Sequence, residues 1–93
     1  MDNRIIPVTD ADLQAILLVP NEALDRPNPI GAPDTLELAL GRDLIQVAER
    51  RRRSMPPLAP LTFKQGENYG VFSYDESAIV EAVRRLDEIV AHG

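Results

Sequence analysis

The stretch of residues 34–53, bracketed by Pro33 and Pro56, is the feature that most constrains how this chain folds. Its apolar residues recur three, four and seven positions apart, which is the spacing of an amphipathic helix. Proline has a fixed φ and no N–H group, so this helix has to end before Pro56. We therefore expect a long helix over about residues 35–53, with Asp34 as its N-cap.

The long helix carries apolar residues on more than one side. Its main stripe consists of Leu36, Leu40, Leu44 and Val47. A second strip is formed by Leu38 and Ile45, which lie about two helical turns apart. A helix with two apolar strips contacts protein on two sides. We expect this second strip to face the remaining elements of the fold or a partner chain.

The last turn of the same helix contains four consecutive arginines, Arg50, Arg51, Arg52 and Arg53. Positive charge near a helix C-terminus is favourable by about 0.3–1 kcal/mol per group. Three interpretations stay open: a solvated helix end, a contact with an acidic protein surface, and a contact with phosphate. Together with Leu38 and Ile45, these arginines are the candidate partner-binding residues.

The rest of the chain predicts three further elements. Thr9 is placed to cap a helix over about residues 10–19. A stiff, proline-rich connector follows at residues 26–33, and a β-hairpin is expected over about residues 61–74. The last element is a helix over about residues 76–91, which has one continuous apolar stripe.

The hairpin register follows from hydrophobic patterning. A four-residue loop at residues 65–68 would pair Lys64 with Tyr69 and Leu61 with Phe72, which gathers the large apolar residues on one face. A two-stranded hairpin alone is marginal in water, so we expect it to lie on the helices or to gain a third strand. The sequence thus predicts a single α+β domain: helix, long helix, β-hairpin and helix, joined by proline-rich connectors.

Composition excludes several kinds of chemistry. The chain has no cysteine and one histidine, His92, near its end, so disulfides, thiolate metal sites and cysteine nucleophiles are ruled out. No glycine-rich phosphate loop or nucleophile motif is present. We predict that the protein is not an enzyme, and we assign no catalytic residue, no cofactor-binding residue and no metal ligand.

Charge is distributed unevenly along the chain. Residues 1–49 carry nine acidic and three basic side chains, and residues 54–93 carry six acidic and three basic ones. The four arginines lie between these acidic parts, and the net charge is −5. An acidic protein repels phosphate over most of its surface, which argues against nucleic-acid binding.

Location is inferred from what the sequence lacks. No apolar run approaches the ~18 residues of a membrane helix, and the first residues lack the basic and apolar regions of a signal peptide. We expect a small soluble protein of the cytoplasm. Its preference for Arg over Lys, with many Ala, Asp and Pro residues, is typical of a genome rich in G and C, and suits a bacterial or phage protein.

These observations favour a non-enzymatic protein–protein interaction module: a small regulator, an inhibitor, or an accessory subunit of a larger complex. The expected partner is another protein or a second copy of the chain in a homodimer. One alternative is nucleic-acid binding through Arg50–Arg53. Another is a small acidic inhibitor that mimics nucleic acid, which the negative charge of residues 1–49 permits.

Overall fold

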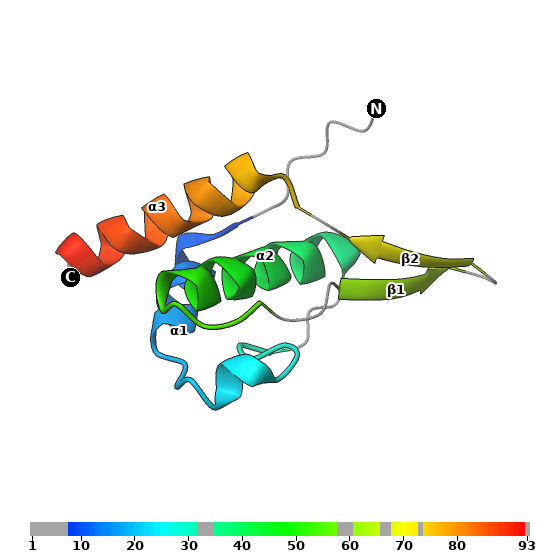
Figure 1. The fold of residues 1–93 in the computed structure, drawn as a ribbon, viewed down its shortest axis with the longest axis horizontal. Coiled ribbons are helices and arrows are strands. Elements are labelled where there is room, and N and C mark those ends of the chain that lie inside the picture. The colour runs from blue at the N-terminus through cyan, green and yellow to red at the C-terminus, as the bar shows by residue number, and fades with distance from the viewer. Residues whose placement is uncertain (1–7, 32–34, 58–60, 66–67, 73, 93) are drawn as a thin grey trace.

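The computed structural model describes residues 8–31, 35–57, 61–65, 68–72 and 74–92; for residues 36–37 and both strands it describes the backbone alone. The elements in chain order are α1 (Asp10–Leu17), a 3₁₀ helix (Ala23–Asp25), α2 (Leu36–Arg52), β1 (Leu61–Gln65), β2 (Asn68–Phe72) and α3 (Glu76–His92). The three α-helices lie together as one body, and the strands extend from one end of it (Figure 1).

Helix α1 begins where its capping residue was expected. The Oγ1 of Thr9 accepts a hydrogen bond from the backbone N–H of Asp12 at 3.2 Å, so the prediction of this cap is confirmed. The helix ends at Leu17 instead of about residue 19. Its last residues tighten into a turn in which the N–H of Val19 donates to the Ile16 carbonyl, because the following Pro20 disfavours helical geometry before it.

Helix α2 is capped by Thr35 and not by Asp34, which lies outside the described residues. The Oγ1 of Thr35 accepts from the N–H of Leu38 at 3.2 Å. At the other end, Ser54 adopts a left-handed φ of 59°, and the N–H of Met55 donates to the Arg50 carbonyl at 2.8 Å. This arrangement is a Schellman motif, which ends the helix before the prolines.

The core is built around α2. Apolar side chains from α1, the 3₁₀ helix, α2 and α3 form one buried cluster: Leu13, Ile16, Leu24, Leu44, Ile45, Ala48, Ile79, Ala82 and Leu86. Full burial of a Leu or Ile side chain stabilises the fold by roughly 1.5–3 kcal/mol. This packing holds the three helices in fixed positions, which determines where the polar side chains of α2 can reach.

The second apolar strip does not form a separate surface. Ile45 is fully buried in the same cluster as Leu44 and Ala48, whereas Leu38 is half-buried. Adjacent residues such as Leu44 and Ile45 are both buried because α1, α3 and the 3₁₀ helix enclose a wide arc of α2. Ile45 therefore presents no accessible surface to a partner of this monomer.

The α+β class expected from the sequence is wrong for the packed body. Every residue of the buried cluster described above comes from a helix. Among the residues whose side chains are described, none from a sheet packs on the helices. Strands β1 and β2 pair antiparallel with each other, with Leu61 opposite Phe72 and Lys64 opposite Tyr69. They extend away from the helices instead of packing across them (Figure 1), because the sides of α2 are already occupied by α1, α3 and the connectors.

None of the described helices is both long enough and apolar enough to cross a bilayer.

Candidate functional site

Arg50, the first arginine of the run, points into the protein. It is 4% exposed, and its Nη1 donates to Asp25 Oδ1 at 2.7 Å and to the Leu24 carbonyl at 3.1 Å. Its Nε donates to the Pro56 carbonyl at 2.9 Å. A single guanidinium therefore joins α2 to the segments on either side of it, and little of its charge is presented to solvent.

Arg50 belongs to a polar stripe on α2, which we call the carbonyl clamp: Arg42, Gln46 and Arg50. These residues are four positions apart and so lie on one face of the helix. Gln46 Nε2 donates to the carbonyls of Leu24 and Arg26 at 2.8 and 2.9 Å. Arg42 Nη1 donates to the Gly31 carbonyl at 3.2 Å.

The carbonyl clamp explains how the proline-rich connector is held in place. Proline offers no N–H, so a connector rich in proline cannot satisfy its carbonyls through a regular backbone ladder. Side-chain donors from α2 do so instead, along the segment between Leu24 and Gly31. A further side of α2 is therefore packed through polar contacts, next to the core face that contains Ile45.

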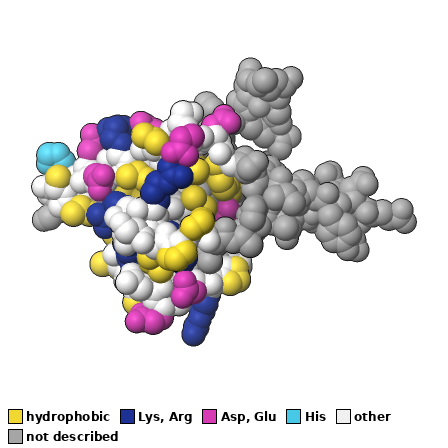
Figure 2. Space-filling model, viewed as in Figure 1, with side chains coloured by type: hydrophobic (Ala, Val, Ile, Leu, Met, Phe, Trp, Pro, Cys, Tyr) yellow, Lys and Arg dark blue, Asp and Glu magenta, His cyan; other side chains and the backbone are white. Residues whose placement is uncertain are grey.

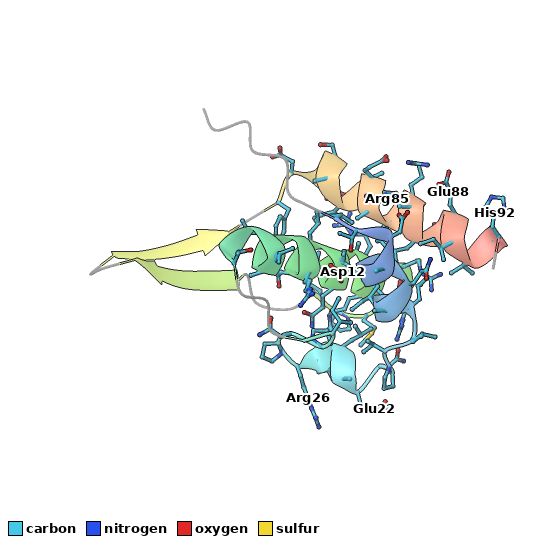
Figure 3. The ribbon with its side chains drawn as sticks, turned by 180° about the vertical axis from the view of Figure 1, so that it is seen from behind. Asp12, Glu22, Arg26, Arg85, Glu88 and His92 are labelled. Atoms are coloured by element: carbon cyan, nitrogen blue, oxygen red, sulfur yellow. The ribbon has the colours of Figure 1, made fainter. Side chains whose placement is uncertain are left out.

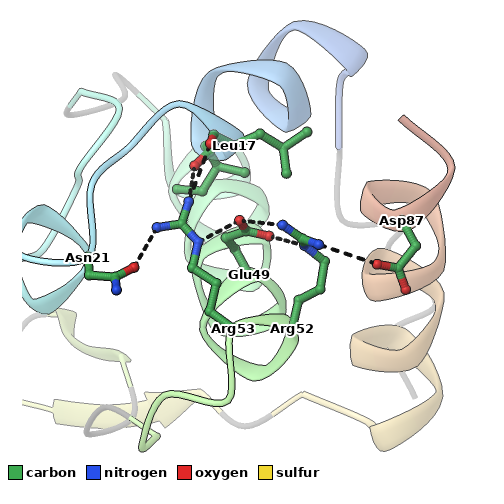
Figure 4. A network of polar contacts seen from close by, with 7 residues as sticks. Leu17, Asn21, Glu49, Arg52, Arg53 and Asp87 are labelled. Atoms are coloured by element: carbon green, nitrogen blue, oxygen red, sulfur yellow. Dashed lines mark hydrogen bonds and ion pairs between the residues drawn. The ribbon is translucent and has the colours of Figure 1, made fainter. Parts of the chain in front are cut away.

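A second group of polar side chains, which we call the Glu49 network, lies at the C-terminal end of α2 (Figure 4). Glu49 is fully buried and its carboxylate accepts from Arg52 Nε and Arg53 Nε, each at 2.7 Å. A buried carboxylate is costly without such partners, because it has lost its hydration. Arg52 extends the network to Asp87 of α3, with an N–O distance of 3.6 Å.

Arg53 extends the network in the opposite direction, to the end of α1. Its Nη2 lies 3.3 and 3.4 Å from the carbonyls of Ile16 and Leu17, and its Nη1 donates to Asn21 Oδ1 at 2.9 Å. The last carbonyls of a helix have no partner within it and carry partial negative charge. Helix α1 has no basic residue in its own last turn, so an arginine from α2 supplies this positive charge.

Arg51 is the most exposed member of the run, and it pairs with Glu76 at the start of α3. This hydrogen bond lowers the pKa of the Glu76 carboxyl and raises the pKa of the Arg51 guanidinium. All four arginines thus contact carboxylates of the same chain. Glu49 was not expected to matter, although its spacing of three and four residues from two arginines is that of helical ion pairs.

Asp43 and Tyr74 form a polar pair between α2 and the residue leading into α3. The Tyr74 hydroxyl donates to Asp43 Oδ2 at 2.6 Å and lies 3.3 Å from the Leu40 carbonyl. Burial raises the pKa of the Asp43 carboxyl, and the hydrogen bond from Tyr74 opposes that rise. Burial, followed by the nearby carboxylate, raises the pKa of the Tyr74 hydroxyl.

The outward side of α3 carries a shallow groove of about 430 Å³. We call this surface the α3 outer face; its residues are Val80, Val83, Arg84, Asp87, Glu88, Ala91 and His92. Val80 is 53% exposed, while Ile79 beside it is buried in the core. On the side of the molecule seen in Figure 2, hydrophobic side chains gather between charged ones of both signs.

The two adjacent arginines of α3 have different surroundings. Arg85 reaches α1, where its Nη2 lies 3.1 Å from Asp10 Oδ1. Arg84 lies on the α3 outer face and pairs with Glu81 and Glu88, and all three side chains are more than half exposed. Glu88 and His92 extend outward from α3 (Figure 3). The α3 outer face therefore combines the exposed Val80 with the charged pair Arg84–Glu88, and its Asp87 also contacts Arg52 of α2.

Among the described residues, no group of three or more His, Asp or Glu side chains is placed to hold a metal ion. Comparison with known protein families, with curated proteins and with solved structures finds no match to this chain.

Proposed function

We propose that this protein is a non-enzymatic protein–protein interaction module of the cytoplasm, which acts as a small regulator, an inhibitor or an accessory subunit. It binds its partner through the α3 outer face. The observation that carries this proposal is that α3 has apolar residues on two sides. One side fills the core with Ile79, Ala82 and Leu86, and the other leaves Val80 more than half exposed in a groove.

The arrangement of the arginines supports a protein partner over nucleic acid. Binding to a nucleic-acid backbone depends on cations that are available to phosphate. Arg50 is buried, and Arg52 and Arg53 share the carboxylate of Glu49. The arginine run therefore has a role within the fold, and a partner-binding role for it loses its main support.

The proposal is tested by comparing two substitutions of exposed apolar residues. Val80→Lys places a charge in the groove of α3, whereas Leu18→Lys changes a residue that is 85% exposed in the turn after α1. A binding protein is first captured from the native host, then purified, and its affinity for each variant is measured by isothermal titration calorimetry.

We expect Val80→Lys to weaken binding by about tenfold or more, which corresponds to about 1.4 kcal/mol, and Leu18→Lys to bind as the wild type does. Equal affinities for the wild type and Val80→Lys would overturn the assignment of the α3 outer face. Circular dichroism spectra that match the wild type show that both variants are folded.

A further inference from the structure

We propose that the α3 outer face binds the same face of a second copy of this chain, with the two α3 helices antiparallel. This inference rests on the proposed function and specifies its partner. It is carried by the order of residues along α3, which is complementary to itself only when one copy is reversed.

The α3 outer face is a straight stripe. Its members fall on successive helical turns, with Val80 on the first, Val83 and Arg84 on the second, Asp87 and Glu88 on the third, and Ala91 and His92 on the fourth. A helix–helix contact is formed by such rows of residues three and four positions apart. The stripe is therefore long enough for a second helix to pack along it over several turns.

Charge and apolar character change along this stripe in a way that selects an orientation. Arg84 is positive and lies in the first half, whereas Asp87 and Glu88 are negative and lie in the second half. A two-fold axis near residue 86 brings Arg84 of each copy beside Glu88 of the other, and Val80 beside His92. A parallel pairing brings Arg84 against Arg84 and Glu88 against Glu88, which is repulsive.

The negative charges near this axis are partly compensated within each chain. Asp87 lies 3.6 Å from Arg52, and Glu88 accepts from Arg84 at 2.7 Å. Long-range repulsion between two chains of net charge −5 is screened by salt over about 10 Å at 0.1 M. Dimerisation should therefore depend more on the sign of the charge at a given position of the stripe than on the net charge of the chain.

The contact between two single helices is smaller than a standard protein interface of about 800 Å² per partner. We therefore expect a weak, reversible dimer that is populated at high protein concentration. Sedimentation equilibrium from about 10 μM to 1 mM covers this range of dissociation constants.

Charge reversal tests the orientation directly. In Arg84→Glu the new carboxylate faces Glu88 of the other copy, and in Glu88→Arg the new guanidinium faces Arg84, so each variant should dimerise about tenfold more weakly. An equimolar mixture of the two variants restores both attractive pairs in a heterodimer. The double variant R84E/E88R restores them in a homodimer.

Recovery of dimerisation in the mixture and in the double variant supports antiparallel pairing. The single variants lose only exposed ion pairs within the chain, which contribute little to stability, so thermal melts should show them folded. Single variants that dimerise as the wild type does, or a failure of the mixture to recover, overturn the inference.

A wild-type chain that stays monomeric at every concentration also overturns the second copy as the partner. The proposed function would then still stand if the partner captured from the host binds the wild type and not Val80→Lys. The loss of that binding difference would overturn the proposed function independently of the dimer.

Discussion

Ser54 adopts a backbone conformation that usually belongs to glycine. Its φ of 59° lies in the left-handed region, at the position that follows the C-cap of α2. A residue with a Cβ atom is strained there by about 1–2 kcal/mol relative to glycine. The hydrogen bonds of the Schellman motif, from Ser54 N–H to the Arg51 carbonyl and from Met55 N–H to the Arg50 carbonyl, hold it in place.

Replacing Ser54 with glycine should therefore stabilise the protein. Relief of the strain is offset by the greater freedom of glycine in the unfolded chain, so we expect a net gain of about 0.5 kcal/mol in the free energy of unfolding. Urea denaturation measures this change. Ser54→Ala is the control, because it retains the Cβ atom and should give no gain; equal stabilities for the two variants would show that the relief of strain does not exceed the entropy cost of glycine in the unfolded chain.

Asp43 makes stability depend on pH in a predictable direction. Burial raises the pKa of its carboxyl in the folded state above the usual value of about 4, so folding favours the protonated form. Stability from this group is present below the unfolded pKa and is lost as pH rises through the folded pKa. Asp43→Asn cannot ionise but keeps an oxygen to accept from the Tyr74 hydroxyl.

We expect the unfolding free energy of Asp43→Asn, measured against that of the wild type by urea denaturation at several pH values, to increase as pH rises from about 4 to 7. In Tyr74→Phe the donor that lowers the pKa of Asp43 is lost, so the pH-dependent change should move to higher pH. A difference between wild type and Asp43→Asn that does not vary with pH would contradict this role of the carboxyl.

The Glu49 network determines the stability of the elements that meet at the end of α2. Glu49→Gln leaves Arg52 and Arg53 without their shared carboxylate, although their side chains are 25% and 17% exposed and so stay partly hydrated. Removing one partner of a buried ion pair destabilises a protein by about 3–5 kcal/mol, and partial exposure reduces this to about 2–4 kcal/mol.

A matched control for this substitution is Glu81→Gln in α3. Glu81 also pairs with an arginine at a spacing of three residues, but its side chain is 57% exposed, so its loss should change stability far less than the loss of Glu49 does. Urea denaturation of both variants gives the comparison. Similar losses for Glu49→Gln and Glu81→Gln would contradict a structural role for the buried carboxylate.

The helices and the contacts between them differ in how well they could be predicted from the sequence. Both long helices could be predicted, since their apolar stripes and the prolines around α2 act locally. The role of the arginines could not be predicted, because a stripe of Arg42, Gln46 and Arg50 has the composition of a solvated helix face. Its burial depends on the connector folding back over α2, and contacts between residues 20 or more apart in the chain leave no local pattern.

At the scale of the whole molecule, the packed body is formed by helices held together by both apolar and charged contacts. The expectation that strands would cover the helices followed from the instability of a lone hairpin in water. It failed because α1 and α3 contact the apolar face of α2, and the connectors are bonded to its polar face. The candidate site on α3 was likewise not predicted, since the sequence indicated one continuous apolar stripe on this helix and did not single out Val80.

The position of Arg53 at the end of α1 has a consequence for the order of folding. Isolated helices shorter than about 12–15 residues are marginal in water, and α1 has eight. Its last carbonyls gain a positively charged hydrogen-bond donor only when α2 is complete as far as Arg53 and both helices have docked. We therefore expect α1 to form late, after the folding transition state, so that substitutions within it accelerate unfolding and leave the folding rate nearly unchanged.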